Sequence, residues 1–138
     1  MMQASTNGGG SCATTGPTDV CKTPTPGGPV PMPYPNIAQN TQVQGSSASK
    51  KVKILNKKTV VVGTKISLST GDEPGSAGGG VVSNKIKGKC TFKTGSSRVK
   101  AEGKKVCYLG SMTGMNGTPD NTVGAQIAPS QTKVTVMP

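Results

Sequence analysis

The sequence has no histidine and no tryptophan, and only three of its 138 residues are aromatic. The absence of histidine removes the commonest general base of enzymes and the commonest protein ligand of transition metals. Three leucines are too few to build the apolar faces of a helical bundle. No apolar run approaches the roughly 20 residues that a membrane-spanning helix needs. Serine–histidine catalytic triads, helical bundles and membrane helices are therefore excluded.

Large apolar residues are also scarce. Valine, isoleucine, leucine and phenylalanine together make up 23 residues, against a net charge of +11. Glycine and proline supply another 31 residues. Such a composition borders on that of disordered chains, because it offers little apolar surface to bury. Either the chain is unfolded on its own, or it forms a small, valine-rich, all-β structure that relies on a partner.

The basic residues are concentrated in one stretch of the chain. Fourteen of the sixteen lie between Lys50 and Lys105, together with only three acidic residues. All but Arg98 are lysines, and aromatic residues that could stack on bases are not interleaved with them. We expect these lysines to lie on the outward faces and edges of strands, where they discourage aggregation. A small basic β nucleic-acid-binding module is the alternative.

Composition divides the 138 residues, read as a single domain, into four segments. They are expected to be a mobile leader (1–18), a proline-rich extended segment (19–49), a β body with an internal repeat (50–117), and a loop with a last strand, KVTV (118–138). The start, MMQASTNGGGSC, has neither the basic nor the apolar region of a signal peptide. We therefore expect the protein to be made in the cytoplasm and to leave only through a dedicated machine.

The proline-rich stretch TPTPGGPVPMPYPN carries six prolines between Pro24 and Pro35. Proline fixes the φ angle and removes a hydrogen-bond donor, so this stretch is extended and cannot be a central strand. We expect Pro24 to Asn36 to be ordered and packed on the β body, with Tyr34 in contact with it.

Short apolar alternations separated by glycine-rich spacers predict the strands of the body. They are KVKIL (51–55), TVVV (59–62), TKISL (64–68), CTFKT (90–94) and RVKAEGKKVCYL (98–109), the last a hairpin that turns at Gly103.

The body contains an internal repeat. VKILNKKTVVVG, from Val52 to Gly63, aligns without gaps on VKAEGKKVCYLG, from Val99 to Gly110, and five of the twelve positions are identical. Two units of one design predict pseudo-rotational symmetry, which would let a single chain match a threefold partner. A chance match of simple valine–lysine strands is the alternative.

Few residues could carry chemistry. Asp72 and Glu73 are adjacent carboxylates, but in GDEPG they have the composition of a turn. The three glycines from Gly78 to Gly80 are not followed by the lysine of a phosphate-binding loop, so a tight turn or a close approach of backbones is expected. We assign no catalytic, cofactor-binding or metal-ligating residue, and partner-binding residues stay unassigned.

The four cysteines lie in neither a CxxC pair nor a zinc-finger spacing. Four thiolates could hold a zinc ion, but Cys90 and Cys107, on expected strands, could equally be small buried hydrophobic residues. Cys12 lies in a glycine- and serine-rich stretch expected to be mobile, which makes it the weakest candidate for any site. We predict no cofactor and no bound zinc.

Three stretches, in this order, resemble the signatures of one family. PMPYPNIA matches a proline–tyrosine signature, GDEPGSAGGGVVS a glycine-rich signature, and EGKKVCYL a third. With the rest of the proline-rich segment, they make residues 19–117 resemble the PAAR-like family of type VI secretion, named after a proline–alanine–alanine–arginine repeat. In PAAR proteins proper, histidine and cysteine hold a zinc near the point. That site cannot be carried over to a sequence without histidine, and the strict tetrapeptide is absent as well.

The resemblance implies a small β-rich cone that caps and sharpens the trimeric valine–glycine repeat spike of a contractile injection system. We therefore expect a non-enzymatic structural tip, with one monomeric copy on each spike trimer and no bound nucleic acid. It would help to load effectors, or bind a chaperone, and would cross a target membrane in passing without stable insertion. The implied route runs from the bacterial cytoplasm out through the contractile apparatus.

Overall fold

The computed structural model describes residues 2–14, 18–117 and 120–137, and these form an all-β fold. The one helical element among the described residues is a single 3-10 turn, η1, at Asn40–Gln42. None of the helical structure in the described ranges is long and apolar enough to cross a membrane. The expectation of an all-β fold with short strands is confirmed.

The strands are short because apolar runs are short and are interrupted by glycine. Their bounds are β1 Met2–Gln3, β2 Ser11–Thr14, β3 Asp19–Thr23, β4 Val30–Tyr34, β5 Ile37–Gln39, β6 Lys53–Ile54, β7 Lys57–Lys58, β8 Lys65–Ile66, β9 Gly79–Gly80, β10 Cys90–Phe92, β11 Lys100–Ala101, β12 Lys104–Lys105, β13 Met112–Met115, β14 Thr122–Ala128 and β15 Thr135–Val136.

A six-stranded antiparallel sheet, in the order β5-β2-β14-β13-β10-β8, forms the middle of the molecule. Side chains from five of these strands meet in one buried cluster, which requires the sheet to curve. The members of this main core are Cys12, Ala38, Val60, Ile66, Cys90, Phe92, Cys107 and Met115. Phe92 is the largest of them and is fully buried.

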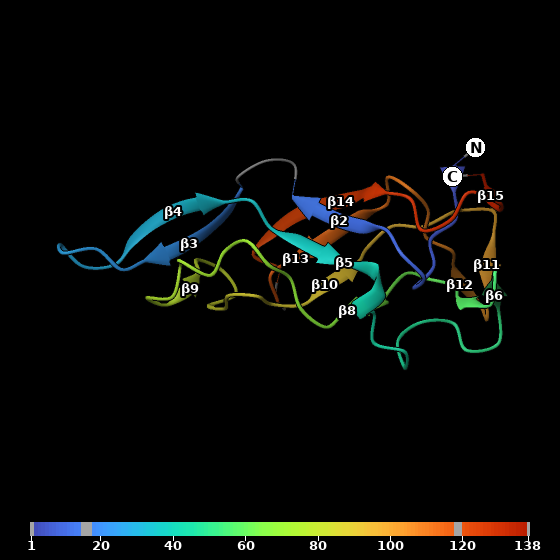
Figure 1. Cartoon of the computed structure of the whole chain (residues 1–138), viewed down its shortest axis with the longest axis horizontal. Coiled ribbons are helices and arrows are strands. Elements are labelled where there is room, and N and C mark those ends of the chain that lie inside the picture. The colour runs from blue at the N-terminus through green and yellow to red at the C-terminus, as the bar shows by residue number, and fades with distance from the viewer. Residues whose placement is uncertain (1, 15–17, 118–119, 138) are drawn as a thin grey trace.

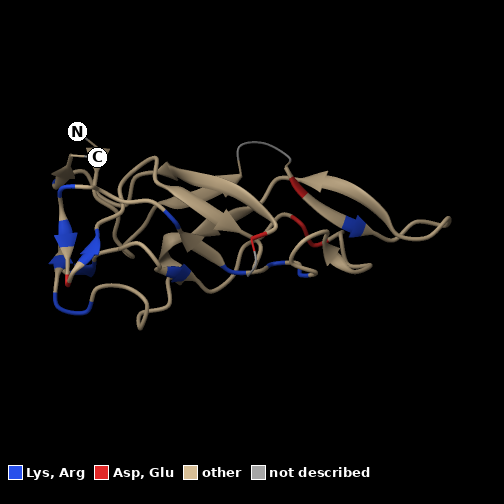
Figure 2. Ribbon diagram, turned by 180° about the vertical axis from the view of Figure 1, so that it is seen from behind, with Lys and Arg blue, Asp and Glu red and all other residues tan. Residues whose placement is uncertain are grey.

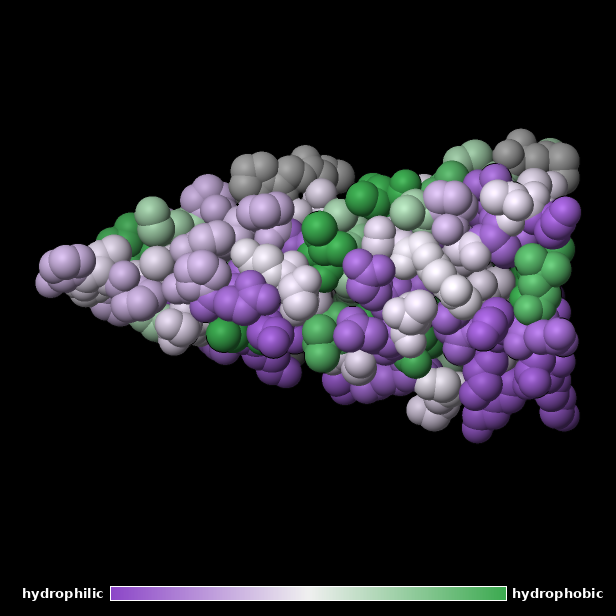
Figure 3. All heavy atoms as spheres, viewed as in Figure 1, coloured by the Kyte–Doolittle hydropathy of each residue, from purple (hydrophilic) through white to green (hydrophobic). Residues whose placement is uncertain are grey.

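The molecule tapers from a broad end to a point (Figure 3). The hairpin of β3 and β4 runs out to the point, with β9 beside β3 in a three-stranded sheet. The two termini lie together at the broad end, close to β15, β11, β12 and β6 (Figure 1). We call this broad end the base.

The proline-rich segment forms β4, the outer strand of the sheet β4-β3-β9. As an edge strand it can carry Pro31 and Pro33, because a missing donor is tolerated where no further strand follows. Tyr34 contacts the neighbouring β3, since its hydroxyl and that of Thr23 lie 2.6 Å apart. The segment thus reaches the body through β3 and through the fully buried Asn36.

The expected mobile leader is wrong for residues 2–14. Those residues form β1 and β2, and β2 lies between β14 and β5 in the central sheet. Cys12 is fully buried in the main core, so its glycine- and serine-rich setting misled the sequence interpretation. Residues 15–17 lie outside the described part of the chain.

The C-terminal segment was expected to be a loop followed by one short strand. Of the expected strand KVTV, Thr135–Val136 forms β15, but β14 is a seven-residue strand at the centre of the sheet. In β14 the polar side chains face inward and the apolar ones face solvent, the reverse of the usual pattern: Gln126 is 2% exposed, whereas Ile127 is 62% exposed. Gly124 is required there, since a Cβ atom would stand 2.4 Å from the Ala13 carbonyl oxygen. Residues 118–119 of the expected loop are outside the described ranges.

Candidate functional site

The base is built from hairpins of one design. β6 pairs with β7, with Lys53 opposite Lys58, and β11 pairs with β12, with Lys100 opposite Lys105. The paired residues of the second hairpin lie 47 residues after those of the first, which is the offset of the sequence repeat. The first hairpin turns at Leu55 and Asn56 and the second at Glu102 and Gly103, all four with positive φ angles between 51° and 82°. Such two-residue turns match the twist of antiparallel strands.

A third hairpin completes the set, and it is made from the two ends of the chain. β1 pairs with β15 in the same antiparallel register, with Met2 opposite Val136 and Gln3 opposite Thr135. Val134 precedes it just as Val52 and Val99 precede the other two. The sequence repeat revealed only two copies because this one is divided between residues 131–137 and residues 2–7.

Each hairpin and the residues that follow it form what we call a unit. The three units are joined in a closed ring of backbone hydrogen bonds. The amide of Ser5 donates to the carbonyl of Cys107 (2.9 Å), that of Cys107 to Val60 (2.9 Å), and that of Val60 back to Ser5 (3.0 Å). All three residues are fully buried. A cycle of this kind has threefold geometry, although the three side chains differ.

A second cycle surrounds the first. Each of its donors lies two residues further along a unit and reaches the next unit. These bonds run from Asn7 to Lys58 (3.0 Å), from Val62 to Lys105 (2.9 Å) and from Leu109 to Gln3 (2.8 Å). The prediction of pseudo-rotational symmetry is therefore confirmed, and the symmetry is threefold.

Each unit also begins with the same kind of cap. A polar side chain accepts a hydrogen bond from the backbone amide three residues further on, which fixes the turn into the hairpin. The pairs are Ser49 and Val52 (3.3 Å), Ser96 and Val99 (3.0 Å), and Gln131 and Val134 (2.8 Å).

A second apolar cluster lies under the hairpins and holds the units together. It contains Ala4, Val61, Ala101, Val106 and Val136, with Ile54 and Tyr108 packed against it. Ile54, Ala101 and Val136 occupy equivalent positions in the three hairpins. Each unit therefore contributes an inward apolar side chain at the same point, and the base has a small core of its own.

Positive charge gathers on the base. Ten of the sixteen basic residues fall in residues 50–58, 98–105 and 131–136, with Glu102 as the single acidic residue of those ranges. Figure 2 shows this cluster at the end where the termini lie. Lys53 and Lys100 are exposed on strands, as the sequence predicted for the outward faces of strands.

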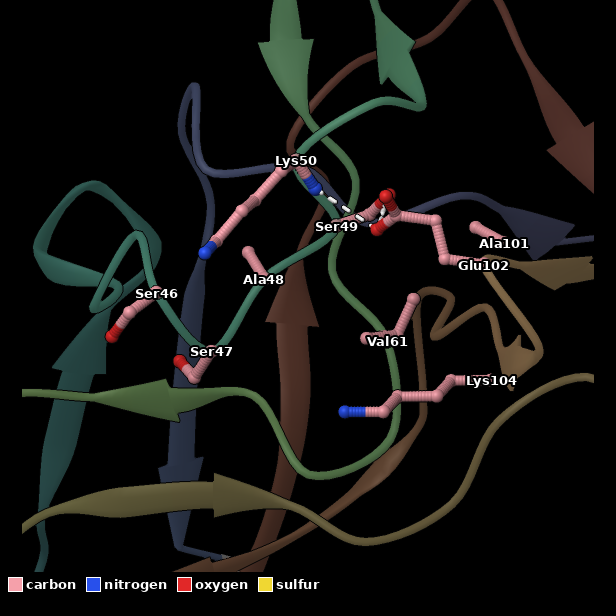
Figure 4. Close-up of a pocket in the computed structure, with 9 residues that line it drawn as sticks. All are labelled: Ser46, Ser47, Ala48, Ser49, Lys50, Val61, Ala101, Glu102 and Lys104. Carbon is pink, nitrogen blue, oxygen red and sulfur yellow. Dashed lines mark hydrogen bonds between the residues drawn. The ribbon is translucent and has the colours of Figure 1, made fainter.

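A pocket of about 240 Å³ opens at the seam between two units. One wall is the loop from Ser46 to Lys50, and the other is the hairpin of β11 and β12 (Figure 4). Glu102 joins the two walls, because its carboxylate accepts hydrogen bonds from Ser49 Oγ (2.8 Å) and from the backbone amide of Lys50 (3.0 Å) in the opposite loop. These bonds hold the pKa of Glu102 below its usual range.

Toward the narrow end, Asp19, Cys21 and Asp72 are fully buried together, with one ligand atom of each within 4.8 Å of the others. Burial and the hydrogen bond to Asp19 raise the pKa of Asp72 to about 7. Burial and the two neighbouring carboxyl groups raise the pKa of Cys21 to about 12. Asp72 does not pair with Glu73, which is exposed and accepts a hydrogen bond from the amide of Gly71 at 2.9 Å.

This cluster is held together by hydrogen bonds, and it lacks the histidine ligands of the zinc site of PAAR proteins proper. Amide groups point their hydrogens at the carboxylates, where a cation would have to lie. The donors are Asn36 Nδ2 (2.9 Å) and Asn116 Nδ2 (3.2 Å) to Asp19, Asn121 Nδ2 to Asp19, and the amide of Lys87 (2.9 Å) to Asp72. Sequence reasoning missed the cluster, because Asp19 and Asp72 are far apart in the chain and only the fold joins them.

A zinc site formed by all four cysteines is not assembled in the structure. Cys12, Cys90 and Cys107 are buried in the main core, whereas Cys21 lies in the carboxylate cluster. The interpretation of Cys90 and Cys107 as small buried residues is confirmed. The absence of bound zinc stays a prediction, which elemental analysis of the protein purified without added metal will check.

The glycines from Gly78 to Gly80 allow close backbone approach, as expected. A Cβ atom on Gly79 would stand 2.5 Å from the amide nitrogen of Lys85, and one on Gly80 would stand 2.3 Å from Asn121 Oδ1. These glycines thus let β9 lie against the segment that carries Asn121 and the carboxylate cluster.

Comparison with known proteins matches the chain to one family model. The model is described as a toxin PAAR-like domain, and it matches residues 12–124. A protein of Pseudomonas aeruginosa, the DNase toxin Tse7, is 36% identical over 112 residues. The match covers 75% of this chain but only 28% of that relative. No solved structure matches the chain.

Proposed function

Because this chain belongs to the toxin PAAR-like domain family, which is associated with type VI secretion, we propose that it is a structural tip that caps the trimeric valine–glycine repeat spike. The observation that supports the proposal best is the closed ring of Ser5, Val60 and Cys107. A single chain with threefold geometry at its base can meet the end of a trimer with three equivalent contacts, so one copy suffices for each trimer.

The shape of the molecule supports the same role. The base is broad, and the opposite end narrows to the proline-rich hairpin between β3 and β4 (Figure 1). Proline restricts the backbone of that hairpin before folding, so the point can be stiff although it has little core of its own. A cone docked by its base would sharpen the spike and meet a target membrane first.

The chemistry of the chain supports a non-enzymatic role. The sequence has no histidine, and the buried carboxylate cluster is occupied by amide donors from neighbouring asparagines. The chain spans 28% of the length of the relative whose name is that of a DNase toxin. We propose that the shared segment serves delivery and that nuclease activity resides in the remainder of that relative.

Delivery also defines the route and the partners. In this proposal the protein is made in the bacterial cytoplasm, docks on the spike, and leaves through the contractile apparatus with effectors or a chaperone bound. It passes a target membrane with the spike and does not insert stably.

Mixing the full chain with a candidate spike trimer tests the proposal. Light scattering after size exclusion should give the mass of one trimer plus one 13.9 kDa chain. Leu55→Asp, in a turn of the base, should weaken the complex, because Leu55 is 56% exposed at the docking face. Val30→Asp, on β4 near the point, is the matched control and should bind like the wild type. Three chains per trimer, or equal binding by both variants, would contradict this docking geometry.

A further inference from the structure

The hairpins of the base carry six lysines without a carboxylate partner in the described ranges, and of these Lys58 donates a hydrogen bond to the carbonyl of Gly45 (3.4 Å). We name as the lysine face the cross-strand pairs Lys53 and Lys58 of β6 and β7 and Lys100 and Lys105 of β11 and β12, which lie on the side of each hairpin away from Ile54 and Ala101. We propose that the lysine face binds an acidic protein surface at the end of the threefold partner. This inference rests on the proposed function, because it specifies the chemistry of the surface on which the tip docks.

Like charges stand directly opposite each other in both hairpins. Lys53 is the cross-strand partner of Lys58, and Lys100 is the cross-strand partner of Lys105. Directly opposed like charges weaken a strand pair. Both hairpins nevertheless have the same arrangement, so the lysines do not serve the stability of the hairpins themselves.

The chain does not neutralise these charges. Within the described ranges, none of the six ammonium groups lies within 4.0 Å of a carboxylate oxygen, and the ion pair found there joins Lys93 to Asp120. The nearest acid in sequence, Glu102, is already bound to Ser49 Oγ and to the amides of Lys50 and Lys51. The lysine face is therefore a positive surface that remains available to an external anion.

The seam pocket gives such an anion a place to enter. Lys104 extends its ammonium group along the pocket toward Ser47, and Lys50 reaches in from the opposite wall (Figure 4). An acidic side chain of a partner could lie between the two ammonium groups and accept charge-assisted hydrogen bonds from them. The pocket lies between two of the three units, which is where a threefold partner would place a side chain.

A protein partner fits this surface better than a nucleic acid. Base readout favours the arginine fork, and Arg98 is the only arginine of the chain. Single-stranded nucleic acids need exposed aromatic rings for stacking, and Tyr108, which packs on the core of the base, is the one aromatic residue there. The ring of three units instead matches the rotational symmetry of a protein trimer.

Charge reversal tests the inference. The variant Lys53→Glu/Lys100→Glu places a carboxylate opposite Lys58 and Lys105, so it should be at least as stable to urea as the wild type. Its affinity for the spike trimer should nevertheless fall on the order of tenfold. The matched control, Lys85→Glu/Lys89→Glu, changes the net charge equally at exposed positions between β9 and β10, and should bind like the wild type.

Wild-type affinity should also fall between about 50 and 200 mM salt, and the reversal variant should lose most of that dependence. If the reversal variant binds the trimer as tightly as the control, the acidic surface is refuted while the tip function stands. If the wild type binds no spike trimer, the proposed function fails. Tighter binding of duplex DNA than of the trimer would overturn the inference in favour of a nucleic acid.

A second measurement needs no spike. Poly-L-glutamate should bind the wild type and the control variant, and should bind the reversal variant at least several-fold more weakly, because only that variant lacks the opposed lysines. Equal binding by the two variants would show that net charge alone attracts the polymer, and it would refute the assignment of the lysine face.

Discussion

At the scale of single residues, the buried carboxyl pair is the most unusual feature of the chain. Asp19 and Asp72 lie together in the interior, where asparagine amides and the backbone amide of Lys87 donate hydrogen bonds to their carboxyl oxygens. Burial disfavours a second negative charge there, so Asp72 keeps its proton at pH values well above the ordinary pKa of an aspartate. The folded state therefore binds this proton more tightly than the unfolded chain does.

Stability should consequently decline as the pH rises. The contribution of Asp72 is complete below its ordinary pKa of 3.8 and is lost as the pH passes about 7, a change on the order of 4 kcal/mol. Urea denaturation of Asp72→Asn should not show this decline, because an asparagine side chain does not titrate. Its carbonyl oxygen can still accept the hydrogen bond from the backbone N–H of Lys87. Glu73→Gln, at the exposed neighbour, should keep it. Identical pH profiles for all three proteins would contradict this assignment.

The sequence could not reveal this pair. Composition correctly placed Asp72 in a turn, but a turn residue is usually exposed, and here it is fully buried against β3. Cys12 was misjudged for the same reason, since local composition reports propensity whereas burial depends on which strands the fold brings together. Cys90 was placed correctly because it alternates with polar residues on a strand, and Cys107 because the repeat aligns it with the apolar Val60.

At the scale of elements, the hairpins were the most predictable part. Glu102 and Gly103 have a turn composition, and the repeat extends the same turn to Leu55 and Asn56. β14 was missed because glycine and glutamine face inward while its apolar residues face solvent, which is the reverse of the pattern that marks a strand. The third unit was missed because its two halves lie at opposite ends of the sequence.

The turn at Leu55 is strained and can be improved. Leu55 has a φ of 51°, a region that costs a residue with a bulky side chain about 1 kcal/mol. Leu55→Asn should therefore raise the free energy of unfolding by about 0.5–1 kcal/mol, because asparagine tolerates this conformation. Leu55→Ala removes the same exposed side chain but keeps the strain, so it should bring no comparable gain. Urea denaturation of the two variants compares them directly; a gain for alanine equal to that for asparagine would refute the role of strain.

At the scale of the whole molecule, the family resemblance and the repeat together led to the correct architecture. The cone, the extended proline-rich strand and the pseudo-symmetry agree with expectation, and the family is confirmed. The threefold order of the symmetry required the structure, because one unit is closed only when the two ends of the chain meet. The arrangement of charge on the base likewise depends on the hairpin registers.

Because the three units are equivalent, the chain should tolerate new ends in another hairpin. A circular permutant opened between Leu55 and Asn56, with residues 137 and 2 joined by a short glycine linker, should fold with a stability within about 2 kcal/mol of the wild type. A permutant opened between Thr113 and Gly114 interrupts the central sheet and should not fold. Circular dichroism and urea denaturation distinguish them, and failure of the first permutant alone would contradict the equivalence of the units.

The ring of Ser5, Val60 and Cys107 also bears on how the molecule takes a mechanical load. In the proposed spike tip, a push on the point would be carried to the base, where the three units meet in this ring. Because the ring is closed, no unit is first or last, so compression is divided among three backbones and each is braced by the next. Bending at the joint with the proposed spike partner would meet resistance from all three units.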